Sequence, residues 1–513
     1  MLRDSFRGAV FAVLISAACR VGAAPSDLVQ AAKAGDHDRA VALLGENVDV
    51  RATSADGTTA LHWAARSDDL DLADRLLKAG ADPKAANRYG VTPLYLAAVN
   101  GSAAMIERLL KAGADANEVG TEGETVLMTV ARGGHVDAAK VLLAAGADVD
   151  AREQWHGQTA LMWAAAQGHP EMISELLAHG ADVNAASNVV NWERQKTAEP
   201  RDKWLPPGGL TPLLFAAREN CLACIPVLVK AGADVNATTP DGISGVVLAL
   251  INGHYDTAAA LIEAGTDPKL VDYTGRTALY AAIDFNTMPA SNRPPPPNVI
   301  DNKLTALDVA RMLLDRGADP NALLKRLPPY RAKLDRGNDG MLGAGTTPFL
   351  RAAKAGDIPA MKLLLEHGAD DSLAPTRSGI TPLMAAAGLG TTEQDTAGRY
   401  KTQAQAIEAI QLLIDRGADV NAQAKDGRTA LHGAALQGYD DVIKFLVSKG
   451  ADLQAKDNKG FSVLDTALGL AGGFGFSGHE GVRREGTAAL IRKLMGDAGV
   501  GSEQASATSP AAN

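Results

Sequence analysis

A short motif that begins with Thr or Ser and opens an apolar helix recurs along this chain. Its first residue is Thr59, Thr92, Thr125, Thr159, Thr211, Ser244, Thr277, Thr347, Thr381, Thr429 or Ser462. Most copies lie 33 or 34 residues apart, and three intervals are longer, at 52, 70 and 48 residues. A fixed period of this length restricts the fold to a repeat array, in which each unit packs on its neighbours.

Each copy carries the start and stop signals of two short helices. The motif's Thr is a good N-cap, and Pro93 or Pro212 at the first helical position needs no hydrogen-bond donor. The second helix is expected to end at a Gly in the left-handed region, and an Asp follows two residues later. These glycines are Gly80, Gly113, Gly146, Gly180, Gly232, Gly265, Gly317, Gly368, Gly417 and Gly450. A finger-like turn such as Asp56-Gly57 then leads into the next copy.

The motif resembles that of ankyrin repeats. Thr59-Ala60-Leu61-His62, Thr92-Pro93-Leu94-Tyr95 and Thr429-Ala430-Leu431-His432 carry the likeness, which extends over about residues 26–498. The resemblance implies an all-α solenoid of about twelve helix-turn-helix repeats with finger-like β-turns and several loop insertions. It also implies a non-catalytic protein that binds another protein through its finger tips and the concave face of its first helices. We expect a monomer.

The N-terminus reads as an export signal. Arg3 and Arg7 precede an apolar stretch, and Val21-Gly22-Ala23 is a suitable cleavage site, so residues 1–23 are predicted to be a signal peptide. The mature protein is then expected in the periplasm or outside the cell. Lipidation at Cys19 is an alternative, but Ser16 stands where a lipoprotein motif normally has an aliphatic residue.

The rest of the chain is predicted to be one solenoid over residues 24–498 with a disordered tail over 499–513. The long intervals place insertions near residues 185–209, 286–303, 322–345 and 389–403, and a further one near 471–486. Two of them, 185–209 and 322–345, fall on the finger side. They flank the repeats that open at Thr211, Ser244 and Thr277, and could wall off a section of the concave face. The alternative is that they are tolerated surface loops.

Composition narrows the partner class. Lys+Arg total 50 against 60 Asp+Glu, a net charge of −10, which argues against binding nucleic acid by neutralising phosphates. The only long apolar run is N-terminal, so no interior membrane span is predicted.

Aromatic residues make up only 4% of the chain, yet several lie at finger turns and in insertions. Large aromatics and arginines make good interface anchors. The predicted partner-binding residues are Arg88, Tyr89, Trp155, His156, Trp192, Trp204 and Tyr273.

The sequence shows no motif that pairs a nucleophile with a base, so we predict no catalytic residues, no metal site and no cofactor. His62, His135, His169, His254 and His432 sit at recurrent repeat positions, where local hydrogen bonds are expected. Cys221 and Cys224 form a C-x-x-C pair between two helices; core packing and a local disulfide both remain open. Two alternative functions are an enzymatic or metal-dependent activity hosted by the inserted loops, and a secreted effector that acts on host proteins.

Overall fold

The structure is a computed structural model that describes residues 27–46, 48–120, 122–190, 207–287, 302–326, 328, 343–374, 376–391, 401–471 and 482–497. The predicted signal peptide and tail lie outside these residues. Helices are the regular elements of the described part, and short antiparallel bridges such as Thr53 with Thr59 and Val271 with Thr277 close the finger turns. The predicted all-α fold class is confirmed.

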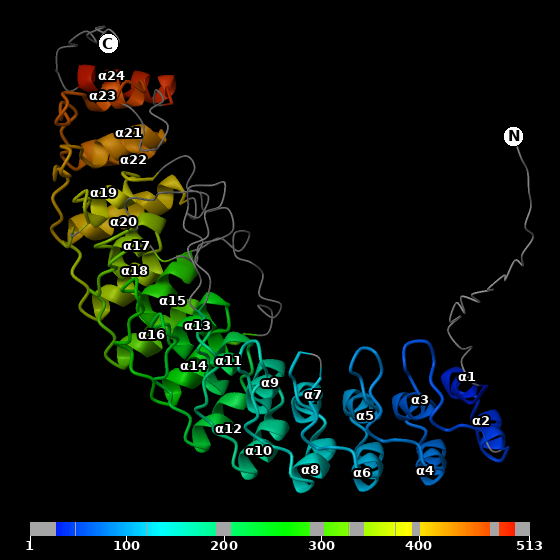
Figure 1. Ribbon diagram of the computed structural model, residues 1–513. Coiled ribbons are helices and arrows are strands. Elements are labelled where there is room, and N and C mark those ends of the chain that lie inside the picture. The colour runs from blue at the N-terminus through cyan, green and yellow to red at the C-terminus, as the bar shows by residue number, and fades with distance from the viewer. Residues whose placement is uncertain are drawn as a thin grey trace, which may run out of the picture. The chain divides into compact units, whose positions relative to one another are not determined.

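The chain divides into two compact units, Met1–Gln154 and Trp155–Asn513. In each unit, helices follow one another as antiparallel pairs that stack side by side (Figure 1). The first unit contains α1 Asp27–Ala34, α2 His37–Leu44, α3 Ala60–Ser67, α4 Leu70–Lys78, α5 Pro93–Asn100, α6 Ala103–Lys111, α7 Val126–Gly133 and α8 Val136–Ala144.

The second unit contains two kinds of connection, short turns and the longer inserted segments. Its helices are α9 Ala160–Gln167, α10 Pro170–Ala178, α11 Pro212–Arg218, α12 Cys224–Lys230, α13 Gly245–Ile251, α14 Tyr255–Glu263, α15 Ala278–Thr287, α16 Ala306–Asp315, α17 Pro348–Ala355, α18 Ile358–Glu366, α19 Pro382–Ala386, α20 Gln403–Asp415, α21 Ala430–Gln437, α22 Asp440–Ser448, α23 Val463–Ala467 and α24 Glu485–Asp497.

Every motif Thr or Ser directly precedes a first helix, the odd-numbered member of a pair, as the sequence predicts. Thr59, for example, accepts a hydrogen bond from the backbone N–H of His62, and Thr92 does the same for Tyr95. Each of these caps satisfies one of the donors that a helix start leaves without an intrahelical partner. Local sequence therefore fixes where each first helix begins.

The second helices end at the predicted glycines. Gly80 and Gly113 have φ of 93° and 102°, values that a residue with a Cβ rarely adopts. The Asp two residues after Gly80, Asp82, accepts a hydrogen bond from the backbone N–H of Lys84 at 2.9 Å, and Asp115 does the same for Asn117. These acids hold their own turn, so a large part of the chain's negative charge belongs to the scaffold.

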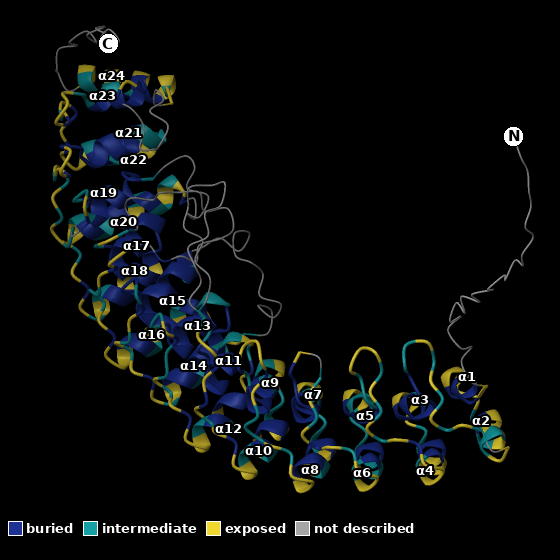
Figure 2. Ribbon diagram, in the orientation of Figure 1, coloured by how far each residue is buried: buried dark blue, intermediate teal, exposed yellow. Residues whose placement is uncertain are grey.

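The core consists of small and aliphatic side chains from both helices of each pair. Ala64, Ala65 and Leu76 are fully buried in the first unit, and Figure 2 shows buried residues concentrated where neighbouring helices face each other. Alanine pairs let first helices approach closely, because a methyl group is all that separates their backbones. The exposed residues lie at the fingers and along the outer edge of the second helices.

The turn between α11 and α12 departs from the repeat pattern. Cys221 and Cys224 are joined by a disulfide, and both are buried. Asn220, with φ of 64°, occupies the left-handed position that Gly168 fills in the preceding pair. Helix α12 has seven residues where α10 and α14 have nine, and it begins 13 residues after its motif Thr rather than 11. The disulfide thus closes a turn that takes the place of the first two residues of the helix.

Candidate binding surface

The finger before α5 presents two of the predicted partner-binding residues. Tyr89 is 64% exposed, and Arg88 is exposed beside it. The backbone N–H of Arg88 donates to the carbonyl of Asp56 at 2.8 Å, and its guanidinium donates to the carbonyl of Ala55. Arg88 therefore ties its finger to the previous one, which leaves Tyr89 as the projecting side chain.

The neighbouring finger tip at Asp56 is itself rigid. Hydrogen bonds from the hydroxyl of Ser54 and the backbone N–H of Thr58 lower the pKa of Asp56 to about 2. The carboxylate is consequently ionised at any physiological pH and acts as the acceptor that shapes the turn. Tyr89 thus projects from a pair of fingers whose backbones are fixed by hydrogen bonds.

Trp155 and His156 lie in the finger before α9, at the start of the second unit. Trp155 is 71% exposed, the most exposed large apolar side chain of the described residues. The carbonyl of His156 accepts a hydrogen bond from the backbone N–H of Asn188 at 2.6 Å. Gly157, with φ of 62°, packs so closely that a Cβ would lie 2.2 Å from Oδ1 of Asn188. A large indole is therefore displayed on a tightly packed turn.

Tyr273 lies in the finger before α15 and is half-buried rather than fully exposed. The guanidinium carbon of Arg326 lies 4.4 Å from the centre of its ring, a cation–π contact. The backbone N–H of Lys325 donates to the carbonyl of Thr274 at 2.7 Å. Burial of the Tyr273 ring is the main cause that raises the pKa of its hydroxyl. The start of the 322–345 insertion thus docks on this finger and covers part of Tyr273.

The predicted residues are distributed over three fingers, in two units. Trp192 and Trp204 lie outside the described residues. Arg326 and Leu323, which is 46% exposed, belong to the surface around Tyr273 although the sequence did not single them out as binding residues. The signal in the sequence was the basic start of the 322–345 insertion, but nothing in it indicated which finger that segment contacts.

The first helices differ in how far their side chains are buried. In α13, α15 and α17 nearly every side chain is buried, including Tyr280 and Arg351 (Figure 2). Most of the two insertions predicted to wall off the concave face over the repeats that begin at Thr211, Ser244 and Thr277 lies outside the described residues, so that arrangement stays a prediction. Trp63 on α3 and Trp163 on α9 are half-buried.

The recurrent histidines act within the scaffold. His254 lies 3.3 Å from the carbonyl of Ala217, and His62 and His432 bridge adjacent repeats. The described residues contain no group of three or more His, Cys, Asp or Glu arranged to hold a metal ion. Across the same described ranges, no helix combines the length and apolarity needed to cross a membrane.

Comparison with known proteins adds the family context. The sequence profile for ankyrin repeats (three copies) matches residues 28–119, 100–187, 213–323 and 393–457. The chain is 30% identical over 253 residues to the mouse B-cell lymphoma 3 protein homolog, covering 48% of this chain and 46% of that protein. It is 28% identical over 266 residues to the Caenorhabditis briggsae ankyrin repeat and KH domain-containing protein CBG24701, covering 48% of this chain and 8% of that one.

A bacterial relative is covered almost completely. The putative ankyrin repeat protein YahD of Escherichia coli (strain K12) is 27% identical over 238 residues, which is 46% of this chain and 95% of YahD. The solved human ASB11 ankyrin repeat domain aligns with a TM-score of 0.39 and 25% identity, over 47% of this chain and 99% of that domain. The chain spans less than half the length of the mouse and Caenorhabditis relatives.

Proposed function

Because this chain belongs to the ankyrin-repeat family, we propose that it is an exported, non-catalytic scaffold that binds another protein. The observation that carries the proposal is the display of Tyr89 and Trp155 on rigid finger turns, 64% and 71% exposed. Aromatic side chains of this size bury large areas on binding and lose little conformational entropy because their turns are already ordered.

The export proposal rests on the sequence of residues 1–23, which lie outside the described residues. The buried disulfide between Cys221 and Cys224 supports it, because structural disulfides form and persist in oxidising compartments such as the periplasm. A protein made for the reducing cytosol would keep these thiols free. We therefore propose that the mature protein works in the periplasm or outside the cell.

Two experiments test the proposal. The first captures partners from an envelope extract with the full chain and with the combined W155A, W192A and W204A variant. We expect the variant to melt within a few degrees of the original chain and to lose the captured protein. Unchanged capture would show that these tryptophans do not belong to the binding surface.

The second experiment is cell fractionation with the N-terminus intact, where an entirely cytoplasmic full-length pool would contradict export.

A further inference from the structure

The first helices of the first unit present a regular exposed row. Four and seven residues after each motif Thr, the chain places Trp63 and Arg66 on α3, Leu96 and Val99 on α5, and Thr129 and Arg132 on α7. Residues three apart share one face of a helix. Arg66, Val99 and Arg132 are exposed, and the other three are half-buried. The row is therefore a continuous surface across three stacked helices.

The charge on this row has one sign. Helices α3, α5 and α7 contain no Asp or Glu, while Arg66 and Arg132 contribute positive charge and Lys33 on α1 adds another. The second helices of the same unit carry both signs and pair them, as in Arg75 with Asp71 and Lys111 with Glu107 at 2.7 Å. The second helices thus neutralise part of their own charge, whereas the row carries cations and α3, α5 and α7 have no Asp or Glu of their own.

Trp63 is the centre of the basic row. Nζ of Lys33 lies 5.7 Å and the guanidinium carbon of Arg66 lies 5.5 Å from the centre of its ring. Within the part of the chain that the structure describes, neither cation belongs to an ion pair. Lys33 and Arg66 both contact the indole of Trp63, and neither is paired with a carboxylate of the described residues. Their charge is therefore available to bind an incoming anionic group.

We propose that this aromatic–basic surface, formed by Lys33, Trp63, Arg66, Val99 and Arg132, binds an extended segment of the partner protein in which acidic and apolar residues alternate. The inference rests on the proposed scaffold function and names the chemistry of its partner. Val99 is 52% exposed between the two arginine-bearing helices and offers an apolar contact. The chain as a whole carries −10, whereas the cations of this row attract an acidic segment.

The dimensions fit an extended peptide. Adjacent helices pack about 10 Å apart, so α3 to α7 span about 20 Å. Extended chain advances about 3.3 Å per residue, which gives about six residues across the row. The first helices α13, α15 and α17 of the second unit are buried and offer no comparable row. The first unit is therefore the part of the chain that we assign to this ligand.

The test selects ligands from a displayed library of random 12-residue peptides on the full chain. The best synthetic peptides are then titrated against the full chain, a K33E and R66E variant, and a K78E and K84E control. Lys78 and Lys84 are exposed outside the row, and the control changes the net charge equally. We expect peptides rich in Asp and Glu, and binding weakened about tenfold or more by K33E and R66E only. If the charge reversal in the K33E and R66E variant lowers its melting temperature, a K33Q and R66Q variant is used in its place.

Other outcomes overturn the inference, and they are separable from failure of the scaffold proposal. Selected peptides without acidic enrichment, or equal weakening by the row and control variants, contradict the acidic ligand. Peptides whose binding is lost with W155A but kept with K33E and R66E support the scaffold and refute the row. Binding of phosphatidylglycerol vesicles through Lys33 and Arg66, with no peptide selected, would assign the row to a membrane surface instead. Absence of any peptide or envelope-protein binding would contradict both proposals.

Discussion

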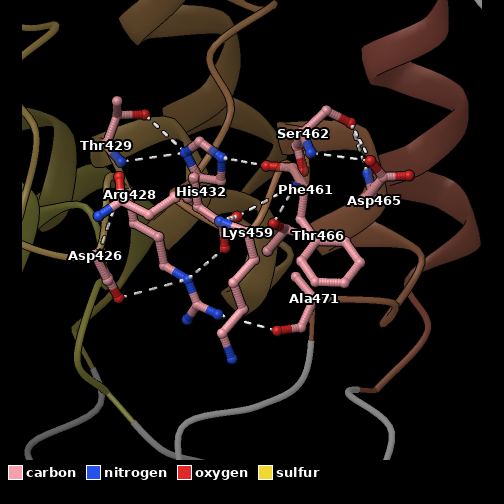
Figure 3. A network of polar contacts seen from close by, with 12 residues as sticks. Asp426, Arg428, Thr429, His432, Lys459, Phe461, Ser462, Asp465, Thr466 and Ala471 are labelled. Carbon is pink, nitrogen blue, oxygen red and sulfur yellow. Dashed lines mark hydrogen bonds and ion pairs between the residues drawn. The ribbon is translucent and has the colours of Figure 1, made fainter. Parts of the chain in front are cut away.

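Nε2 of His62 lies 2.9 Å from the carbonyl oxygen of Val91, one repeat further along the chain. The other ring nitrogen, Nδ1, accepts from the backbone N–H of Thr59 at 3.2 Å, so one buried imidazole joins its own helix start to the next finger. His432 repeats the arrangement, with Nε2 3.4 Å from the carbonyl of Phe461 (Figure 3). The histidine of the motif is therefore a link between stacked repeats.

Replacing His62 with Ala should destabilise the first unit by about 2–3 kcal/mol. The change removes two hydrogen bonds and leaves the partly buried carbonyl of Val91 without its donor and a cavity beside it. Denaturant unfolding of the full chain, followed by circular dichroism, measures the effect. Replacing exposed His179 with Ala is the control and should shift stability by no more than about 0.5 kcal/mol. Equal effects of the two substitutions would show that His62 does not link repeats.

Stability should fall as the pH drops below about 6.5. Burial lowers the pKa of His62 and of His432, so the unfolded chain binds protons at these sites before the folded chain does. The contribution of these two histidines to the free energy of unfolding is complete above about pH 6.5 and is lost progressively below it. The unfolding midpoint measured from pH 8 to pH 5 should decline, and a H62Q and H432Q variant should decline less.

His37 should affect the pH dependence of stability in the opposite direction. Its hydrogen bond to Asp69 at 2.7 Å raises its pKa, so this pair contributes stability at low pH that is lost as the pH rises through the raised pKa. Replacing His37 with Gln should therefore steepen the acid-side decline slightly. A flatter decline in that variant would contradict the assigned directions.

The ion pair between Arg351 and Asp284 should be costly to break. Nε of Arg351 lies 2.6 Å from Oδ1 of Asp284, and the side chains are 1% and 8% exposed. Replacing Arg351 with Met leaves the carboxylate buried without the guanidinium, at a cost of about 3–5 kcal/mol. Unfolding of R351M, D284N and the double variant measures the coupling, and the double variant should lose less than the two singles together.

The matched control for this pair is Arg311 with Glu366, whose atoms lie 4.0 Å apart with both side chains more than half exposed. Replacing Arg311 with Met should change stability by no more than about 0.5 kcal/mol, because solvent screens an exposed pair. Additive losses in the Arg351 and Asp284 variants would indicate that the two residues do not act as a pair.

The disulfide between Cys221 and Cys224 should form in the exported protein and stabilise it modestly. A loop of four residues implies about 2 kcal/mol from constraint of the unfolded chain. Alkylation and mass spectrometry of the purified protein should leave both cysteines unmodified until a dithiol reductant is added. Free thiols at both positions in protein from an envelope fraction would contradict this assignment.

Elements that depend on local residue chemistry could be predicted from the sequence. Thr59 caps α3, Gly80 has a positive φ, and Asp82 holds its turn, because each role needs only neighbours within a few residues. The link made by Asn117 was missed. Its amide donates to the carbonyl of Gly146 at 3.0 Å and accepts from the N–H of Asp148 at 2.7 Å, although its fixed place two residues after Asp115 was visible.

The candidate surface was harder to predict because it depends on contacts between distant segments. Tyr89 and Trp155 project as expected, since finger tips follow from the repeat itself. The contact of Arg326 with Tyr273 depends on where an insertion docks, which its composition does not specify. The aromatic–basic row was missed for a different reason. No single residue indicates it, because the row depends on the positions of Trp63 and Arg66 recurring on α5 and α7 and on the stacking of those helices.

The most direct test of the central claim is photo-crosslinking in cells of the source organism, with benzoylphenylalanine placed at Tyr89 or at Trp155. Lys78, exposed on α4 and away from the fingers, is the control position. A protein-binding scaffold predicts a discrete protein adduct from both finger positions and none from Lys78. No adduct from either finger position, or the same adducts from all three, would contradict the account.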